Sequence, residues 1–160
     1  MTGVSQMKVF YLDSSALVKR YIAEQGSSWI VDLCLPAHNT MIATERITKA
    51  EVASAMARKY RNSDLTQPNY QIALQDLTHH FDHEYILVEI DEAVVNLAVE
   101  LTTRQKLRGY DAIQLAAALS INTPLTQANF PPITFIAADE NLLQAADSEG
   151  LKSENPNIFS

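Results

Sequence analysis

The feature that most constrains this chain is a short apolar strand that ends in an acid and runs directly into a helix. In "VFYLDSSALVKRYI", residues 9–22, β-branched and aromatic residues typical of a buried strand precede Asp13, and apolar residues at helical spacing follow it. The pattern returns in "ITFIAADENLLQAA", residues 133–146, where Asp139 stands between strand and helix. Units of this kind predict parallel strands joined by helices.

The rest of the chain alternates between strands and helices. Strands are expected at residues 7–12, 40–44, 85–90 and 133–138. Helices are expected at residues 14–24, 27–35, 46–61, 67–82, 92–105, 110–120 and 140–148. The proline- and asparagine-rich stretch 122–132 is expected to be a loop. The predicted fold class is α/β: a three-layer α/β/α, Rossmann-like domain with a mostly parallel central sheet.

Length and composition narrow the classes of protein to consider. The 160 residues predict a single domain over residues 1–160, with residues 1–6 as a flexible leader. A formal net charge of −7 argues against a protein that holds nucleic acid mainly by a broad basic surface. The single cysteine, Cys34, excludes an internal disulfide and fits a cytoplasmic location. Neither a signal peptide nor a membrane-spanning stretch is expected.

Four acids occupy positions that are expected to be the first turns of helices. Asp13 and Asp139 each close a strand, whereas Glu51 lies in "ITKAEVASAMARKY" and Asp111 in "LRGYDAIQLAAAL". Each has an ordinary structural explanation when taken alone. Asp13 and Asp139 suit helix N-caps, Thr48 and Glu51 match a capping box, and Asp111 complements a helix dipole.

Taken together, the four acids predict a shared site. Ligands of parallel sheets bind beyond the carboxyl ends of the strands, and small residues around Glu51 and Asp111 leave room for carboxylates to converge there. Converging carboxylates without Lys or Arg repel one another unless a cation neutralises them or some stay protonated. Oxygen ligands select hard ions such as Mg²⁺ or Mn²⁺, and such sites support phosphodiester hydrolysis.

Four stretches in this order, "YLDSSALVKRY", "TKAEVASA", "YDAIQLAAAL" and "FIAADENLLQAA", carry a family resemblance that extends from residue 8 to residue 151. The chain resembles the PIN-domain ribonucleases, and in particular the VapC-type toxins of type II toxin–antitoxin pairs. The resemblance implies a PIN-like fold and an endoribonuclease that depends on Mg²⁺ or Mn²⁺. By motif position, it assigns catalysis and metal binding to Asp13, Glu51, Asp111 and Asp139.

The resemblance also implies partners and further site residues. The partners are an RNA substrate, a small cognate antitoxin that covers the site, and a second copy of the chain in a homodimer. The hydroxyl of Ser14 or Ser15 matches a group that orients ligands or water in the family. Glu140 and Asn141 directly follow the fourth acid and are candidates to share its role, and the role of segment 121–132 stays open.

Two other functions compete with this one. A phosphohydrolase that forms an aspartyl phosphate on Asp13 would typically carry a second Asp two residues later, where this chain has Ser15. A binding module that keeps the fold but has lost catalysis would be expected to lack some of the acids, and all four are present.

Two further groups of residues have both a structural and a functional interpretation. Basic side chains near the first two motifs either form solvated helix faces or contact RNA phosphates, and Arg58 shares a helix face with Glu51. These basic residues are Lys19, Arg20, Arg46, Lys49, Arg58, Lys59 and Arg61. His79 and His83, four residues apart, either bind zinc or form a solvated helix end.

Overall fold

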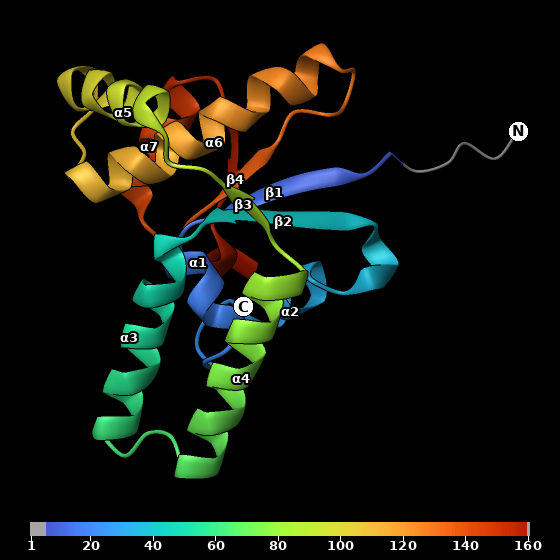
Figure 1. Ribbon diagram of the computed structural model, residues 1–160, viewed down its shortest axis with the longest axis vertical. Helices are drawn as coiled ribbons and strands as arrows, with labels where there is room; N and C mark the ends of the chain where they lie inside the picture. The colour runs from blue at the N-terminus through green and yellow to red at the C-terminus, as the bar shows by residue number, and fades with distance from the viewer. Residues whose placement is uncertain (1–5, 160) are drawn as a thin grey trace, which may run out of the picture.

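The computed structural model describes residues 6–159, in which one parallel sheet lies between two layers of helices (Figure 1). The strand order is β3-β2-β1-β4-β5, and all neighbouring strands are parallel. The strands are β1 (Lys8–Leu12), β2 (Thr40–Glu45), β3 (Ile86–Val88), β4 (Thr134–Ile136) and β5 (Lys152–Glu154). The predicted three-layer α/β fold is therefore confirmed, and its sheet is parallel throughout the described part.

The helices divide between the two faces of the sheet. The α-helices are α1 (Ser14–Leu17), α2 (Ser27–Leu33), α3 (Ile47–Arg61), α4 (Gln67–His83), α5 (Glu92–Arg104), α6 (Gly109–Gln127) and α7 (Glu140–Ser148). Short 3₁₀ turns are η1 (Val18–Arg20), η2 (Pro36–His38) and η3 (Pro156–Phe159). In Figure 1, α5, α6 and α7 lie above the sheet, and α1 to α4 lie below it.

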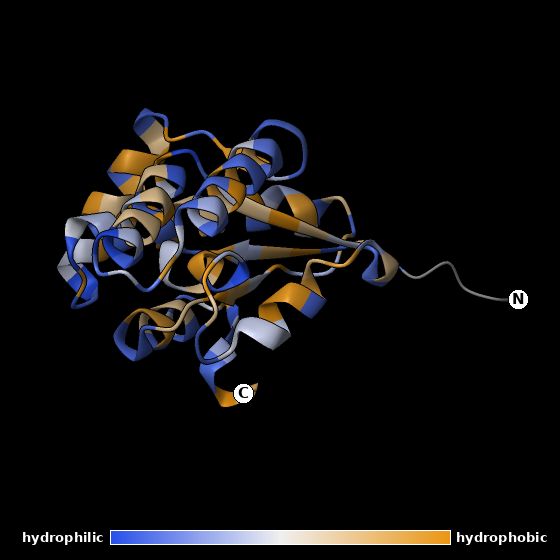
Figure 2. Cartoon of the chain, turned by 90° about the horizontal axis from the view of Figure 1, so that it is seen from below, coloured by the Kyte–Doolittle hydropathy of each residue, from blue (hydrophilic) through white to orange (hydrophobic). Residues whose placement is uncertain are grey.

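Alternation along β1 explains why both faces are covered. Val9 and Tyr11 are buried in one apolar cluster with residues of α5, α6 and α7. Leu12 is buried in a second cluster with residues of α1 to α4, and Phe10 packs against that cluster. Successive strand residues point to opposite faces, so β1 contributes to two cores. Figure 2 shows the resulting hydrophobic strands between helices that are hydrophilic on their outer sides.

The strand order places a switch point beside β1. The chain runs from β1 outward to β2 and β3, then returns across the sheet to β4 and β5 on the other side of β1. The two directions diverge between β1 and β4, where the Asp13 amide donates to the Ile136 carbonyl at 3.2 Å. Parallel sheets bind ligands at this kind of place, outside the carboxyl ends of the strands.

Two local predictions were wrong. The segment 122–132 is not a loop throughout, because α6 continues to Gln127 with Pro124 inside the helix. Ile121 and Leu125 pack against the core from the same side of that helix, which explains why it continues past the bond that proline removes. The strand β5 was not expected at all, since its sequence Lys-Ser-Glu is polar and it lies at the edge of the sheet.

Other boundaries moved by a few residues. The first predicted helix, 14–24, is the short α1 followed by η1, and the strands expected at 85–90 and 133–138 are shorter. Residues 1–5 of the predicted leader lie outside the described part, and the Gln6 side chain donates to the Asn129 carbonyl at 2.9 Å. Among the described helices, none has both the length and the apolar character to span a bilayer. That residues 1–160 form one domain stays a prediction.

Candidate active site

A cavity of about 650 Å³ opens at the carboxyl end of the sheet, and three of the four predicted acids line it. The lining residues are Glu51, Lys106, Leu107, Arg108, Tyr110, Asp111, Asp139 and Asn141. Asp13, the fourth acid, is buried with 4% of its surface exposed, and the charges of Asp111 and Asp139 act on it. The structure thus brings together acids from four separate parts of the chain.

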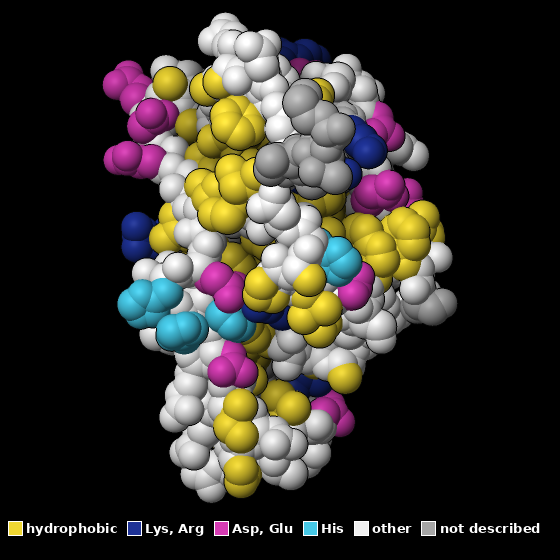
Figure 3. All heavy atoms as spheres, turned by 90° about the vertical axis from the view of Figure 1, so that its right-hand side faces the viewer, with side chains coloured by type: hydrophobic (Ala, Val, Ile, Leu, Met, Phe, Trp, Pro, Cys, Tyr) yellow, Lys and Arg dark blue, Asp and Glu magenta, His cyan; other side chains and the backbone are white. Residues whose placement is uncertain are grey.

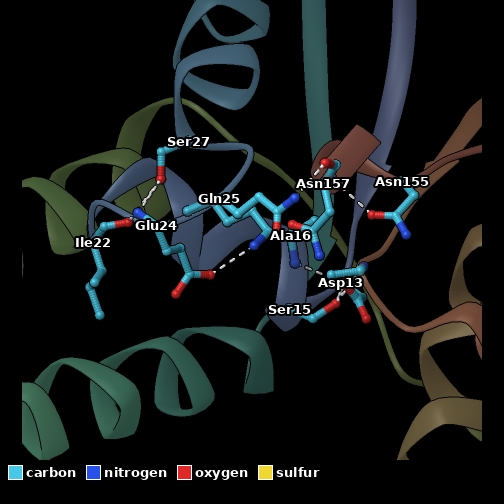
Figure 4. A network of polar contacts seen from close by, with 11 residues as sticks. Asp13, Ser15, Ala16, Ile22, Glu24, Gln25, Ser27, Asn155 and Asn157 are labelled. Carbon is cyan, nitrogen blue, oxygen red and sulfur yellow. Dashed lines mark hydrogen bonds and ion pairs between the residues drawn. The ribbon is translucent and has the colours of Figure 1, made fainter. Parts of the chain in front are cut away.

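Asp13 is both a helix cap and a member of this acid cluster. It is the N-cap of α1, and its Oδ1 accepts hydrogen bonds from the Ala16 amide at 3.0 Å and the Ser15 hydroxyl at 2.7 Å (Figure 4). Burial raises the pKa of Asp13 to about 7; the two hydrogen bonds oppose this rise, and the charges of Asp111 and Asp139 add to it.

Asp139 has the same local role at the end of the β4 segment. It is the N-cap of α7, and its Oδ1 accepts from the Leu142 amide at 3.0 Å. The two strand-end acids are connected through Ser15, whose oxygen accepts from the Ala138 amide at 2.9 Å while its hydroxyl donates to Asp13. Of the two candidate serines, Ser15 is therefore the one bonded to Asp13.

The two residues after Asp139 differ in their surroundings. Glu140 accepts a hydrogen bond from the Asn155 side chain at 2.6 Å and does not line the cavity. Asn155 in turn accepts from the Asn157 amide, and the Gln25 side chain donates to the Asn157 carbonyl, so the C-terminal turn lies against the α1–α2 region (Figure 4). Asn141 lines the cavity beside the fourth acid.

Glu51 and Asp111 are carried by helices that they do not cap. Asp111 lies in the first turn of α6, as predicted, but Glu51 is the fifth residue of α3 and lies beyond its first turn. The predicted capping box is wrong, because Arg46 holds the N-cap position and Thr48 is buried within the helix. Burial raises the pKa of Asp111, the charge of Asp139 raises it further, and Arg108 lowers it.

The cavity also contains basic side chains that were not predicted to belong to it. Lys106 and Arg108 come from the α5–α6 loop, and the Lys106 carbonyl accepts from the Asn141 side chain at 2.6 Å. The acids were expected to converge without Lys or Arg, and this expectation was wrong. The alternation of basic residues in "KLRGYD" directly before Asp111 was the signal available in the sequence.

Lys19 and Arg20, two basic residues near the first motif, form neither a solvated helix face nor an open path for RNA phosphates. Lys19 is 5% exposed and forms an ion pair with Glu24 at 2.9 Å. Arg20 is bound to Glu84 at 2.7 Å and to the Tyr85 hydroxyl at 2.8 Å. Lys19 is therefore paired inside the protein, whereas Arg20 is largely buried and paired with Glu84, which is itself 49% exposed.

Glu45 is a buried acid near the site that sequence reasoning missed. It ends β2 with no exposed surface, and its carboxylate accepts hydrogen bonds from the Tyr110 hydroxyl and the Gln114 side chain, both at 3.2 Å. Burial raises the pKa of Tyr110, and the charge of Glu45 contributes to the rise, so its hydroxyl remains a donor. The strand–acid–helix pattern of "MIATERITKAE" was a usable signal, since it repeats the arrangement around Asp13.

The carboxylates of the cavity suit a hydrated ion such as Mg²⁺ or Mn²⁺ better than an ion whose ligands all come from the protein. Nowhere in residues 6–159 do three carboxylate, imidazole or thiol groups gather closely enough to hold an ion. Mg²⁺ commonly uses one or two carboxylates and keeps several waters. The cap bonds of Asp13 and Asp139 use Oδ1, which leaves Oδ2 of each outside these bonds. Oxygen ligands that repel one another therefore fit a hydrated hard cation.

The histidines do not add a metal site. His79 and His83 share a face of α4 with their rings 4.8 Å apart, and both are exposed. Figure 3 shows histidine side chains together on this surface. His80 is instead bound through Nδ1 to the Tyr21 hydroxyl at 2.7 Å. Because no third ligand joins the pair within the described residues, the structure supports the solvated helix end.

Comparisons with known proteins agree with this picture. No protein-family model matches the sequence. Ribonucleases VapC45 and VapC49, from two strains of Mycobacterium tuberculosis, are each 35% identical over 121 residues, which cover 74% of this chain and 80% of theirs. A chain of VapBC2 from Rickettsia felis, solved with a fragment of promoter DNA, has a TM-score of 0.60 at 16% identity, covering 92% of this chain and 98% of that one. At that identity the structural likeness shows the fold alone.

Proposed function

Because the chain belongs to the VapC family of ribonucleases, we propose that it is a metal-dependent endoribonuclease that cleaves RNA phosphodiester bonds. The observation that carries the proposal is the cavity at the switch point, which Glu51, Asp111 and Asp139 line together, while the charges of Asp111 and Asp139 act on the buried Asp13. A carboxylate-lined cavity of this kind suits metal-assisted hydrolysis of a phosphodiester.

The four acids divide into ligands and a residue that handles water. One or two of Asp13, Asp111 and Asp139 would hold Mg²⁺ or Mn²⁺ directly through carboxylate oxygens, which hard ions prefer, and the others would contact the water molecules of the ion. When bound, the ion supplies Lewis-acid polarisation of a phosphoryl oxygen and lowers the pKa of a water molecule. Glu51 completes the ligand set, or orients the attacking water and accepts its proton.

The basic side chains of the α5–α6 loop would hold the RNA. Lys106 and Arg108 line the cavity beside the acids, so they are placed to contact phosphates next to the scissile bond. Asn141 holds the loop to α7 through the Lys106 carbonyl. Phosphate contacts fix the position of the strand without reading its bases.

The test is cleavage of RNA by the purified protein with Mg²⁺, with Mn²⁺ and with EDTA. We expect cleavage with either ion and none in EDTA. The ion should also stabilise the fold, by about 2.7 kcal/mol at 100 times its dissociation constant. Cleavage that persists in EDTA would contradict metal dependence. A protein that cleaves no RNA under any of these conditions would instead be a binding module with this fold.

We further propose that the protein is the toxin of a type II toxin–antitoxin pair, a cytoplasmic homodimer kept silent by a small antitoxin that covers the cavity. Membership of the VapC family supports such a pairing, and the VapBC2 chain from Rickettsia felis, solved with a DNA fragment from its promoter, has the same fold. Expression of the chain alone should slow bacterial growth, whereas the Asp13→Asn variant should be harmless. Equal growth of both strains would contradict the toxin role, and light scattering would test the dimer.

A further inference from the structure

Two of the four site acids are carried by helices whose first turns have no cap of their own. Arg46 and Arg108 hold the N-cap positions of α3 and α6, and neither side chain makes a capping hydrogen bond within the described part of the chain. The first amides of a helix need partners from outside the helix. The starts of α3, which carries Glu51, and of α6, which carries Asp111, must therefore be held by other groups.

One carboxylate, that of Glu45, contacts both helix starts. Its Oε2 accepts from the Ile47 amide, the first of α3, at 2.6 Å. Its Oε1 accepts from the Thr48 hydroxyl in the same turn at 3.2 Å and from the Tyr110 hydroxyl at 3.2 Å. Tyr110 is in the first turn of α6, so Glu45 joins the two helices at the turns nearest the site.

A glutamine from α6 completes this network. The two N–H groups of the Gln114 side chain are shared among three acceptors: Glu45 at 3.2 Å, the Thr48 hydroxyl oxygen at 3.0 Å and the Tyr110 hydroxyl oxygen at 2.9 Å. The side-chain oxygen of Gln114 accepts from the Tyr11 hydroxyl at 2.6 Å, which ties the network to the central strand β1. Each member thus has hydrogen-bond partners in the buried space between β1, β2, α3 and α6.

The position of Glu45 is costly for stability alone. It has no exposed surface, and no salt bridge within residues 6–159 includes it. A buried carboxylate without a cation is tolerated only through its hydrogen bonds, and well-packed apolar residues often give equal or greater stability. Glu45 contacts Ile47, one helical turn before Glu51, and Tyr110, the residue before Asp111, and these contacts suggest a role in geometry.

We propose that Glu45 is a positioning residue that fixes the separation of Glu51 and Asp111 across the cavity. Glu45 does not itself line this cavity, so it acts through Ile47 and Thr48 on one helix and through Tyr110 on the other. The inference rests on the proposed function of the cavity, because the separation of these acids matters only if they act together.

The experiment compares three variants that cut the network at different places. Glu45→Gln keeps one acceptor oxygen and replaces the other with an NH2 group that cannot accept, so the side chain can no longer accept from the Ile47 amide and from the Tyr110 hydroxyl at the same time. Tyr110→Phe removes the hydroxyl contact between α6 and Glu45 and leaves that of Gln114. Thr48→Val removes the hydroxyl on α3 that contacts Glu45 and Gln114. The matched control is Asp91→Ala, which removes the capping carboxylate of α5, a helix that carries none of the four acids.

Each protein is measured for melting temperature, for Mn²⁺ affinity by calorimetry, and for kcat and KM on RNA. We expect Glu45→Gln to weaken Mn²⁺ binding and lower kcat by about 10-fold or more, the range found for residues that orient metal ligands. KM should stay within about 2-fold, as expected when only interactions made in the transition state are lost. The single-connection variants should show smaller losses, and adding Tyr110→Phe to Glu45→Gln should cost less than the sum. The control should melt lower but keep its Mn²⁺ affinity and kcat.

A purely structural Glu45 would give the opposite result. In that case Glu45→Gln, Tyr110→Phe and Thr48→Val would melt lower and yet bind Mn²⁺ and turn over RNA like the wild type. If Glu45→Gln does not fold, the other two variants decide by the same measurements. If the wild type binds Mn²⁺ but cleaves no RNA, the ribonuclease proposal is overturned, and Mn²⁺ affinity alone tests the role of Glu45. If the wild type neither binds Mn²⁺ nor cleaves RNA, the ribonuclease proposal and the positioning role of Glu45 are both overturned.

Discussion

The four site acids form two pairs that are held in different ways. Asp13 and Asp139 stand at the ends of strand segments and cap the helices that follow them, so each is fixed by its neighbours in sequence. Glu51 and Asp111 cap nothing, and the starts of their helices are joined by Glu45, which comes just before the first helix but lies 65 residues from Tyr110 in the second. The first pair therefore combines structure with chemistry, whereas the second pair is free to serve chemistry alone.

Because of this difference, substitutions in the two pairs should have the same effect on activity but different effects on stability. Loss of a carboxylate from either pair should remove the activity, because all four belong to one proposed site. Loss from the first pair should also change stability, because the same oxygens hold helix amides.

The largest expected effect is on cleavage, and it should be common to both pairs. Asp13→Asn and Glu51→Gln keep side-chain size but remove a charge, and we expect each to lower metal-dependent cleavage by about 10²-fold to 10⁴-fold, the range for acid–base or ligand groups. Initial rates on one RNA substrate provide the measurement. The control is Glu92→Gln, a first-turn acid of α5 that does not line the cavity. Near-normal cleavage by either variant would remove that residue from the site.

The second largest expected effect is a pH dependence of stability that comes from Asp13. Its pKa rises from an ordinary value of 3.8 to about 7 in the metal-free fold, mainly through burial. The folded protein therefore binds more protons than the unfolded chain across this window, and its stability should fall as pH rises through it. At about 1.4 kcal/mol per pKa unit, the loss of stability is no more than about 4.5 kcal/mol. Urea unfolding in EDTA at a series of pH values measures it.

Asp13→Asn is the control for this pH dependence. The amide oxygen can still accept from Ala16 and Ser15, but the side chain no longer titrates. The stability of the variant should therefore fall much less as pH rises. At neutral pH without metal, the variant should be more stable than the wild type. Parallel stability curves for the two proteins would show that Asp13 is not the group responsible.

The difference between the two pairs of acids also determined which of them could be predicted from local sequence. Asp13 and Asp139 were accessible from local pattern alone, because a strand, an acid and a helix follow one another directly. Asp111 and Glu51 needed the order of four motifs, since each sits in an alanine-rich helix that has an ordinary explanation. The strands and helices followed from apolar spacing, with errors mainly at their ends.

What could not be predicted depends on contacts between distant parts of the chain. Glu45 was passed over because Tyr110 and Gln114, which hold it, lie 65 and 69 residues away. The burial of Lys19 depends in the same way on packing that no local pattern reports. The continuation of α6 through Pro124 follows from apolar contacts with the core, which outweigh the local signal of a proline.

A smaller effect should appear at the other capping acid. Asp139→Ala removes the acceptor for the Leu142 amide and should lower the free energy of unfolding by about 1 kcal/mol. Asp139→Asn keeps an equivalent acceptor, so its stability in EDTA should be close to that of the wild type. Chemical unfolding of the three proteins at one pH makes the comparison. Equal loss in the two variants would mean that the charge, and not the cap, stabilises the helix.

The smallest effect is expected for the stability of Glu51→Gln. Glu51 is exposed and lies beyond the first turn of α3, and none of the hydrogen bonds found among residues 6–159 uses its carboxylate. Surface changes of this kind usually alter stability by no more than about 0.5 kcal/mol, which corresponds to a shift of about 1–2 °C in melting temperature for a chain of this size. Thermal melts in EDTA, with Asp139→Ala measured beside it, provide the test. A clear drop for Glu51→Gln would mean that this acid also supports the fold, and the distinction between the two pairs would fail on the residue assigned to chemistry alone.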